Sequence, residues 1–401
     1  MTSPLEPPLP RVYLDHAATT ALDPEVLEAM LPYLREHFGN PSSVHSFGQA
    51  ARGAIDEARA RVAEIIGARD SEIVFTGSGS EADNLAIVGS MAAAAVLNEG
   101  ARPDLVTSAI EHHAVLNSAR ALDRSRHQVS VARVLTTGQV DLNDLEEKTT
   151  DRTALLSIML ANNETGVLQP ISEVVRLARA KGALIHTDAV QGLGKLRIDV
   201  VALDVDLLTM SAHKIHGPKG VGALYVRSGT RMTAQIRGGS QERNRRAGTE
   251  NVAAIVGFGK AAELAQKRLA ADSKQLEQMR NRLEAALIAA GGGAVQRNGS
   301  EEHRIPTTTS LSFEGVSGED LLIALDLAGI AASTGAACAA GSPEPSHVLL
   351  AMGLTRERVN GSLRFSLGRG TTAEEVDRTV QGVGAAMERL RKKGGRPPQA
   401  L

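Results

Sequence analysis

Short apolar runs alternate with longer helical patterns from residue 72 to about residue 250 of the 401-residue chain. We expect strands at 72–75, 104–110, 128–134, 153–160, 183–188 and 206–210, with helices at 80–97, 114–124, 141–148 and 171–182. Strand–helix alternation with Gly-bearing loops is typical of βαβ units, which build an α/β fold around a parallel sheet. Functional residues are then expected to cluster at the carboxyl ends of the strands.

The pattern changes near residue 252. A long helix rich in Ala, Glu, Lys and Arg is predicted over 252–290, followed by strands at 308–313 and 362–368 and helices at 319–328 and 373–391. We therefore expect a large, mostly parallel-sheet domain over 11–260, whose first residues could join the smaller domain, and a smaller α+β C-terminal domain over 261–392. The Pro-rich residues 1–10 and the polar residues 393–401 are expected to be tails.

Composition excludes several classes of protein. Hydrophobic residues make up 42% of the chain, which excludes global disorder, and 44 Lys and Arg against 46 Asp and Glu provide no basic field for nucleic acid or anionic membrane. The most apolar late run, 321–332, is shorter than the about 20 residues that a membrane span needs. One cysteine, Cys338, can form neither an intrachain disulfide nor a multi-Cys zinc site, so we expect no metal and a reducing, cytoplasmic location.

The strongest local signal is SAHKIHGPKGVG (211–222), which directly follows the apolar strand 206–210. A partly desolvated Lys214 just past a strand end can bind an aldehyde cofactor covalently, although a loop lysine taken alone is usually only solvated. Asp188 ends the preceding strand and could pair with the pyridinium nitrogen of pyridoxal phosphate, or it could be the N-cap of a helix that begins at Ala189.

A phosphate needs backbone N–H groups at a helix N-terminus, and TGSGSEADN (76–84) offers them after strand 72–75. The same stretch fits a G-x-G-x-x-A dinucleotide fingerprint through Gly77, Gly79 and Ala82. That alternative requires an acidic residue after the next strand, where Glu111 stands before two histidines, so it is weakened but not excluded. His112 could lie flat on a cofactor ring, or it could be an ordinary capping or surface histidine.

Two further residues complete the candidate site. Cys338 lies in STGAACAAGSPEPS (333–346), a small-residue loop that suits a mobile, exposed nucleophile better than a packed thiol. Arg364 lies on the polar side of the alternating strand SLRFSLG (362–368), where it could clamp a substrate carboxylate or form an ordinary ion pair.

With these pieces assembled, the chain resembles the class V aminotransferase group of pyridoxal-phosphate enzymes, and within it the NifS/IscS-type cysteine desulfurases. The resemblance runs from YLDHAATT (13–20) to SLGRGTTAEEVD (366–377). The stretches that carry it are GNPSSVHSFG (39–48), EADNLAI (81–87), EHHAVL (111–116), NNETGVLQP (162–170), HTDAVQGLGK (186–195), HKIHGPKGVGALYV (213–226), QERNRRAGT (241–249) and ASTGAACAAG (332–341).

The resemblance implies the fold of PLP-dependent transferases of type I and a role for each matching residue. Lys214 would bind the cofactor and move the substrate's Cα proton, Arg364 would bind the substrate carboxylate, and the Cys338 thiolate would take the sulfur. The other implied contacts to the cofactor are these: Asp188 to the ring nitrogen, Gln191 to the ring hydroxyl, His112 stacked on the ring, Asn163 to cofactor or substrate, Gly79, Ser80, Ser211 and His213 to the phosphate, and Thr249 to the phosphate of a neighbouring subunit.

The implied function is conversion of L-cysteine to L-alanine and a Cys338 persulfide for sulfur transfer to an acceptor such as an Fe–S scaffold protein. The implied assembly is a homodimer with no nucleic-acid or membrane partner. A selenocysteine lyase or another class V aminotransferase would use the same Lys214 site, but a transaminase would have no need of Cys338. A nucleotide-binding or scaffold protein remains a further alternative, because 76–84 also fits the dinucleotide fingerprint.

Overall fold

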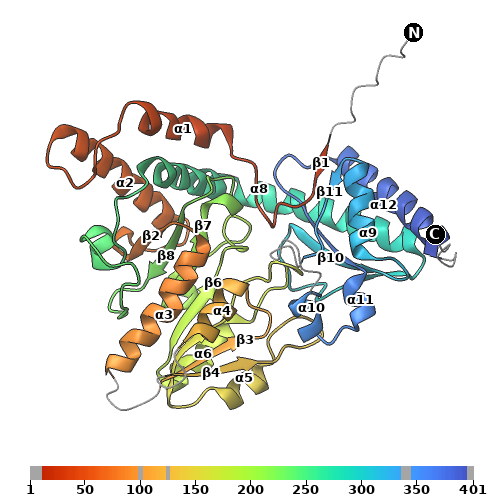
Figure 1. Ribbon diagram of the computed structural model, residues 1–401, viewed down its shortest axis with the longest axis horizontal. Coiled ribbons are helices and arrows are strands. Elements are labelled where there is room, and N and C mark those ends of the chain that lie inside the picture. The colour runs from red at the N-terminus through yellow and green to blue at the C-terminus, as the bar shows by residue number, and fades with distance from the viewer. Residues whose placement is uncertain (1–10, 98–102, 123–126, 336–344, 395–401) are drawn as a thin grey trace, which may run out of the picture.

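The computed structural model describes residues 11–97, 103–122, 127–335 and 345–394 (Figure 1). Its central sheet has seven strands in the order β2-β8-β7-β6-β5-β3-β4. Their bounds are β2 Ile73–Thr76, β3 Asp104–Ser108, β4 Gln128–Ala132, β5 Thr153–Ser157, β6 Leu184–Asp188, β7 Leu207–Ser211 and β8 Gly222–Val226. All pairs are parallel except those of β8, which runs antiparallel to β2 and β7. The prediction of a mostly parallel α/β sheet is confirmed.

Helices α3 to α7 connect these strands. Their bounds are α3 Gly79–Leu97, α4 His113–Ala121, α5 Leu142–Lys148, α6 Ile171–Lys181 and α7 Val200–Leu203. Ahead of the sheet come α1 (Pro24–Arg35) and α2 (Ser46–Glu64), which pack against the long helix α8 (Val252–Gly291) and were not among the expected elements. The start of α1 carries a recognisable signal, because the Asp23 carboxylate accepts the Glu25 N–H at 2.9 Å and Pro24 follows the cap.

The remaining elements form a second layered unit around a three-stranded antiparallel sheet, with β10 between β9 and β12. Their bounds are β1 Val12–Tyr13, β9 Val295–Arg297, β10 Thr308–Phe313, α9 Gly318–Leu327, β11 Ile330–Ala331, α10 His347–Ala351, α11 Arg356–Asn360, β12 Ser362–Ser366 and α12 Ala373–Gly394. Strand β1 pairs in parallel with β11, so the start of the described chain lies beside this C-terminal unit (Figure 1). No described helix is long and apolar enough to cross a lipid bilayer.

Helix α8 contributes to two separate hydrophobic cores. Its first half, including Phe258 and Ala265, packs into the core of the seven-stranded sheet, whereas Leu276, Leu283 and Leu287 pack into the core around β10 and β12. A single 40-residue helix therefore joins the two units (Figure 1). Because an α-helix rises about 1.5 Å per residue, its length allows one element to span both cores.

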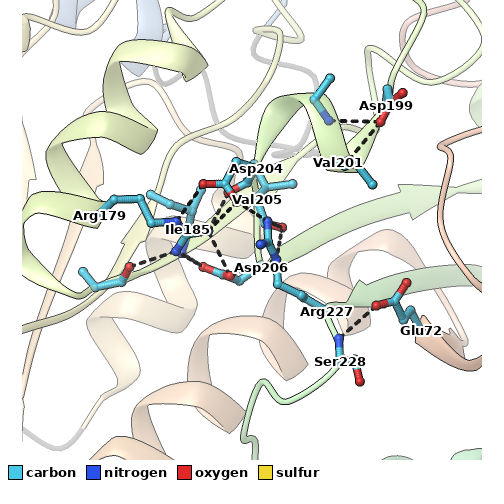
Figure 2. Close-up of polar contacts among 12 residues, drawn as sticks. Glu72, Arg179, Ile185, Asp199, Val201, Asp204, Val205, Asp206, Arg227 and Ser228 are labelled. Carbon is cyan, nitrogen blue, oxygen red and sulfur yellow. Dashed lines mark hydrogen bonds and ion pairs between the residues drawn. The ribbon is translucent and has the colours of Figure 1, made fainter.

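Charged side chains hold β6, β7 and β8 together at the edge of the sheet opposite the candidate site (Figure 2). Arg179, near the end of α6, binds Asp206 at 2.7 Å and Asp204 at 3.0 Å. Arg227, which follows β8, binds Asp204 at 2.6 Å, and Asp206 also accepts the Ile185 N–H at 2.8 Å. Since these contacts tie backbone and side chains of neighbouring strands, they favour a single register.

A buried ion pair fastens α2 to the segment that precedes α8. The two terminal nitrogens of Arg59 donate to the two carboxylate oxygens of Glu242 at 2.7 and 2.6 Å, and both side chains are 2% exposed. Arg59 also donates to the Ile73 carbonyl at 2.8 Å and lies 4.7 Å from the centre of the Phe75 ring. Glu242 in turn accepts the Phe75 N–H at 2.8 Å, so β2 takes part in the same contact.

Replacing Arg59 by Met is expected to lower the free energy of unfolding by about 3–5 kcal/mol, because the Glu242 carboxylate would stay buried without its partner. Arg61→Met on the same helix is the matched control, since its partners Glu57 and Glu263 are partly exposed and the expected loss is below about 1 kcal/mol. Unfolding in guanidinium chloride followed by circular dichroism measures both. Equal losses in the two variants would contradict this account.

Candidate active site

A cavity of about 260 Å³ lies at the carboxyl edge of the seven-stranded sheet, next to β12. The residues suggested by the sequence that line it are Gly79, Ser80, His112, Asn163, Asp188, Gln191, Ser211, His213, Lys214 and Arg364. They come from segments far apart in the chain, and the structure brings them together because β2, β3, β5, β6 and β7 all point the same way.

Lys214 ends a short 3₁₀ turn, Ala212–Lys214, that directly follows β7. Its Nζ donates to the carbonyl oxygens of Ala17 and Ala18 at 2.5 and 2.8 Å. Both carbonyls belong to the segment after β1, so the N-terminal part of the chain forms one wall of the cavity beside this amine.

Asp188 is the last residue of β6 and is 6% exposed. Burial raises the pKa of its carboxyl to about 6, while a hydrogen bond from the Val190 N–H at 2.9 Å and the charge of Lys214 act in the opposite direction. The carboxyl is therefore mainly ionised at neutral pH, as a partner for a pyridinium N–H must be. Turns follow Asp188, so the interpretation as a helix N-cap is wrong.

His112 combines the two roles that the sequence left open. It is the N-cap of α4, where its Nδ1 accepts the Ala114 N–H at 3.1 Å, and its ring also lines the cavity. Burial lowers its pKa to about 4, with a further contribution from the charge of Lys214. At neutral pH the ring is uncharged, and since Nδ1 accepts a hydrogen bond, its proton is on Nε2.

The turn that leads into the first residues of α3, which we call the phosphate turn (residues 77–80), leaves little room for extra atoms. A Cβ at Gly79 would lie 3.1 Å from a Val190 methyl carbon and 3.3 Å from the Ser211 Cβ, and a Cβ at Gly222 would lie 2.5 Å from the Ser78 carbonyl carbon. Ser78, Gly79 and Ser80 also line the cavity, so backbone N–H groups at the start of α3 are placed where a phosphate could bind.

The dinucleotide alternative needs a carboxylate that can reach a ribose. Glu111 is fully buried, and it accepts the Met159 N–H at 3.0 Å and the Ser108 hydroxyl at 2.5 Å. These contacts occupy its carboxyl group, and Glu111 is not among the residues that line the cavity, which disfavours the dinucleotide interpretation.

Arg364 projects from β12 into the cavity and is held by two partners. One terminal nitrogen donates to the Asp15 carboxylate at 2.7 Å and the other donates to the Asn163 carbonyl at 2.8 Å. Its buried Nε has no hydrogen-bond partner within the described part of the chain. The structure combines both alternatives for Arg364, since it forms an ion pair and also faces the cavity. Asp15 was not predicted as its partner, although it stands in the motif YLDHAATT.

Asp83, in the first turns of α3, is a second cavity residue that sequence reasoning missed. It is 1% exposed, and burial followed by the nearby charges of Asp188 and Glu111 raises its pKa well above the ordinary value. Its Oδ1 lies 3.6 Å from Nε2 of His186, a fully buried imidazole whose pKa is lowered to about 3 by burial. The EADN motif carried the only available signal, a carboxylate four residues after Gly79.

Two predicted residues are not among those that line the cavity. Thr249 is exposed and lies on the segment that precedes α8. Cys338 lies outside the described residues; Gly335, the last described residue before it, lines the cavity.

The residues present fit pyridoxal phosphate. A lysine amine, an ionised buried carboxylate, an uncharged imidazole and a glycine turn at a helix start surround one cavity. The buried, unpartnered polar atoms Asp83 Oδ1 and Arg364 Nε belong to residues that line this same cavity, as expected where a polar group is to be bound.

The chain is similar to known proteins of one family. The family model of class-V aminotransferases matches residues 12–379. A cysteine desulfurase of Trichormus azollae is 47% identical over 380 residues, which are 95% of this chain and 94% of the relative. Among solved structures, a NifS-like protein superimposes with a TM-score of 0.88 at 37% identity, covering 95% of this chain and 100% of that one. A structure described as SspA in complex with cysteine superimposes with a TM-score of 0.77 at 35% identity, covering 89% and 98%. The chain therefore belongs to the class-V aminotransferase family, whose enzymes depend on pyridoxal phosphate.

Proposed function

We propose that this chain is a cysteine desulfurase that converts L-cysteine to L-alanine and keeps the sulfur as a persulfide on Cys338. The observation that carries the proposal is the meeting of Lys214, Asp188 and Arg364 in one cavity, in a chain closely similar to cysteine desulfurases. The neighbour that was solved with cysteine supports the choice of substrate.

Residues of this chain would hold the phosphate at one end of the cofactor and the ring at the other. The phosphate turn and His213 would bind the phosphate, Gln191 and Asp188 would bind the ring, His112 would stack on it, and Lys214 would bind it covalently. Pyridoxal phosphate supplies an electron sink for the electrons of the substrate's Cα–H bond.

Arg364 and Lys214 would carry the first half of the reaction. The Arg364 guanidinium binds the substrate carboxylate, and its fixed bonds to Asp15 and the Asn163 carbonyl hold it in position. In its uncharged amine form, Lys214 Nζ would take the Cα proton of the bound L-cysteine, since it lies at the wall of the same cavity as Arg364. The neutral His112 ring can donate a hydrogen bond from Nε2 without adding charge.

Cys338 would carry the second half. Its thiolate attacks the sulfur of the substrate, so that an S–S bond forms as the substrate's C–S bond breaks, and the electron pair of that bond returns to Cβ. Cβ is protonated, L-alanine leaves, and Cys338 retains one additional sulfur atom. The sum is L-cysteine plus a thiol giving L-alanine plus a persulfide, which balances without an external oxidant.

Three further features belong to the same proposal. The smaller domain would carry Cys338, and its boundary with the large domain falls within α8 after Ala265, beyond the expected residue 260, because Ala265 still packs into the core of the seven-stranded sheet whereas Leu276 packs into the other core. The sulfur passes to an acceptor protein such as an Fe–S scaffold, because a persulfide on a protein side chain must be handed on before another turnover. The proposed location is a reducing cytoplasm, where the Cys338 thiol stays free of disulfides and available as a nucleophile.

A homodimer is the proposed assembly, with Thr249 reaching the phosphate of the neighbouring subunit. An exposed apolar cluster on the end of α1 and the start of α2, which we call the α1–α2 cluster, supports it. Its members are Leu34, Phe38, Val44 and Phe47, between 55% and 89% exposed, with the two Phe rings 5.6 Å apart. Such a cluster is unusual on a surface that stays in water.

The Cys338→Ala variant is expected to bind pyridoxal phosphate with the visible absorbance of the unmodified chain but to form no persulfide, because the attacking thiol is missing. Lys214→Ala is expected to lose both properties. Mass spectrometry of the intact protein after incubation with L-cysteine, together with an alanine assay, measures the outcome. Persulfide formation at the unmodified rate in Cys338→Ala would refute the mechanism, and full activity on an amino donor would indicate a transaminase.

Replacing Arg364 by Gln is expected to lower kcat/KM for L-cysteine about 10- to 150-fold, as expected for loss of a charged hydrogen bond. Arg364→Lys keeps the charge but loses the forked geometry, so an intermediate loss is expected. Steady-state alanine production at several cysteine concentrations provides the values. If Arg364→Gln lost no more activity than Arg297→Gln, which changes an arginine outside the cavity lining, Arg364 would not bind the substrate.

The Phe38→Asp/Val44→Asp variant is expected to shift the chain from dimer to monomer, because two charges would be desolvated at the α1–α2 cluster. Val201→Asp, which changes a 76% exposed valine on α7, is the control and should remain dimeric. Sedimentation velocity over a range of protein concentrations measures the association. A purely monomeric unmodified chain at micromolar concentration would rule out the assembly.

A further inference from the structure

The segment 241–249 lies between β8 and α8 and has an unusual backbone. Glu242, Arg243 and Asn244 have φ angles of +45°, +55° and +62°, a left-handed conformation that residues with a Cβ rarely adopt in succession. Such a conformation persists only where the surroundings hold it in place. The buried pair of Glu242 with Arg59 is one such contact.

A second contact joins the far end of this segment to the phosphate turn. Arg246 donates from Nε to one Glu81 carboxylate oxygen at 2.8 Å and from Nη2 to the other at 3.4 Å. That second oxygen also accepts the Gly77 N–H at 2.8 Å. Glu81 is therefore held between the guanidinium of one segment and the backbone of the other.

The two backbones approach this ion pair closely. A Cβ at Gly77 would lie 2.8 Å from the Glu81 carboxylate and 3.8 Å from Arg246 Nη2, and a Cβ at Gly248 would lie 3.4 Å from Arg246 Nη1. Gly248 itself has a φ of +110°, which few other residues tolerate. A displacement of either backbone would therefore disturb the Glu81–Arg246 pair.

The charges of these groups indicate how phosphate binding would affect the Glu81–Arg246 contact. A phosphate bound at the phosphate turn would be an anion at the same backbone whose Gly77 N–H donates to the Glu81 carboxylate, and the two would repel each other unless a cation were present. Arg246 is that cation, so phosphate binding favours the state in which Arg246 is paired. By reciprocity, the paired state favours phosphate binding by the same factor.

We propose that Glu81 and Arg246 are positioning residues that couple phosphate binding at the phosphate turn to the conformation of segment 241–249. The inference rests on the proposed function, in which this segment carries Thr249 to the neighbouring subunit. Binding of the cofactor in one site would then order the segment that completes the next site.

Hydrogen exchange read by mass spectrometry on the full chain tests this, with and without pyridoxal phosphate and with inorganic phosphate as a second probe. In the unmodified chain the cofactor should slow exchange in both 77–80 and 241–248, by about fivefold or more in the latter. In Arg246→Met the cofactor should still protect 77–80 but not 241–248. Arg243→Met removes an equal charge from an exposed arginine of the same segment and should behave like the unmodified chain.

Two milder variants keep the test informative if Arg246→Met folds poorly. Glu81→Gln retains an acceptor for the Gly77 N–H without the charge, and Arg246→Lys retains the charge without the fork, so both should show reduced protection of 241–248. Full protection of 241–248 in Arg246→Met or Glu81→Gln would overturn the coupling while leaving the cofactor site intact. No protection of 77–80 in the unmodified chain would instead contradict the cofactor site itself, and the coupling with it.

Discussion

The direction of the strands is the constraint on which the candidate site depends. Parallel pairing of β3, β5, β6 and β7 forces their carboxyl ends to one edge, and β2 points the same way because β8 runs antiparallel to both of its neighbours. Each loop at that edge then places a polar group in the lining of the same cavity. A lysine after β7, a carboxylate at the end of β6 and a glycine turn after β2 meet there without any of them being adjacent in sequence.

Burial then largely determines the protonation state of the titratable side chains at that edge. Asp83 is driven toward its neutral form by desolvation and by the neighbouring carboxyls, and the His112 ring is driven toward its neutral form by desolvation and by Lys214. Asp188 stays ionised near neutral pH, because a backbone N–H and the charge of Lys214 offset part of its desolvation. The cavity lining thus combines the Asp188 carboxylate with the Lys214 and Arg364 cations. Such an arrangement suits a zwitterionic amino acid and an anionic cofactor.

Much of this was predictable from the sequence, and the gaps have physical reasons. The strands and helices predicted from residue 72 onward show clear periodicity, and their positions agree with the observed ones to within a few residues, but the shorter elements β8, β9, β11, α7, α10 and α11 were not predicted. Helices α1 and α2 were missed because Pro32 lies inside α1 and two glycines, Gly48 and Gly53, lie inside α2, and these residues weaken a helical pattern. Asp15 was missed as an Arg364 partner because 349 residues separate the two, and no local pattern reports a contact at that distance.

The sequence by itself determined the class of fold, the family and the chemical types in the site, since periodicity and motifs are local properties of the chain. Only the tertiary structure decided how the alternatives for Arg364, His112 and Asp188 are resolved. It showed that Arg364 is both paired and directed into the cavity, that His112 both caps a helix and faces the ligand volume, and that Asp188 starts no helix. Protonation states and partners depend on burial and on contacts between distant segments, and these exist only once the strands have been assembled into one sheet.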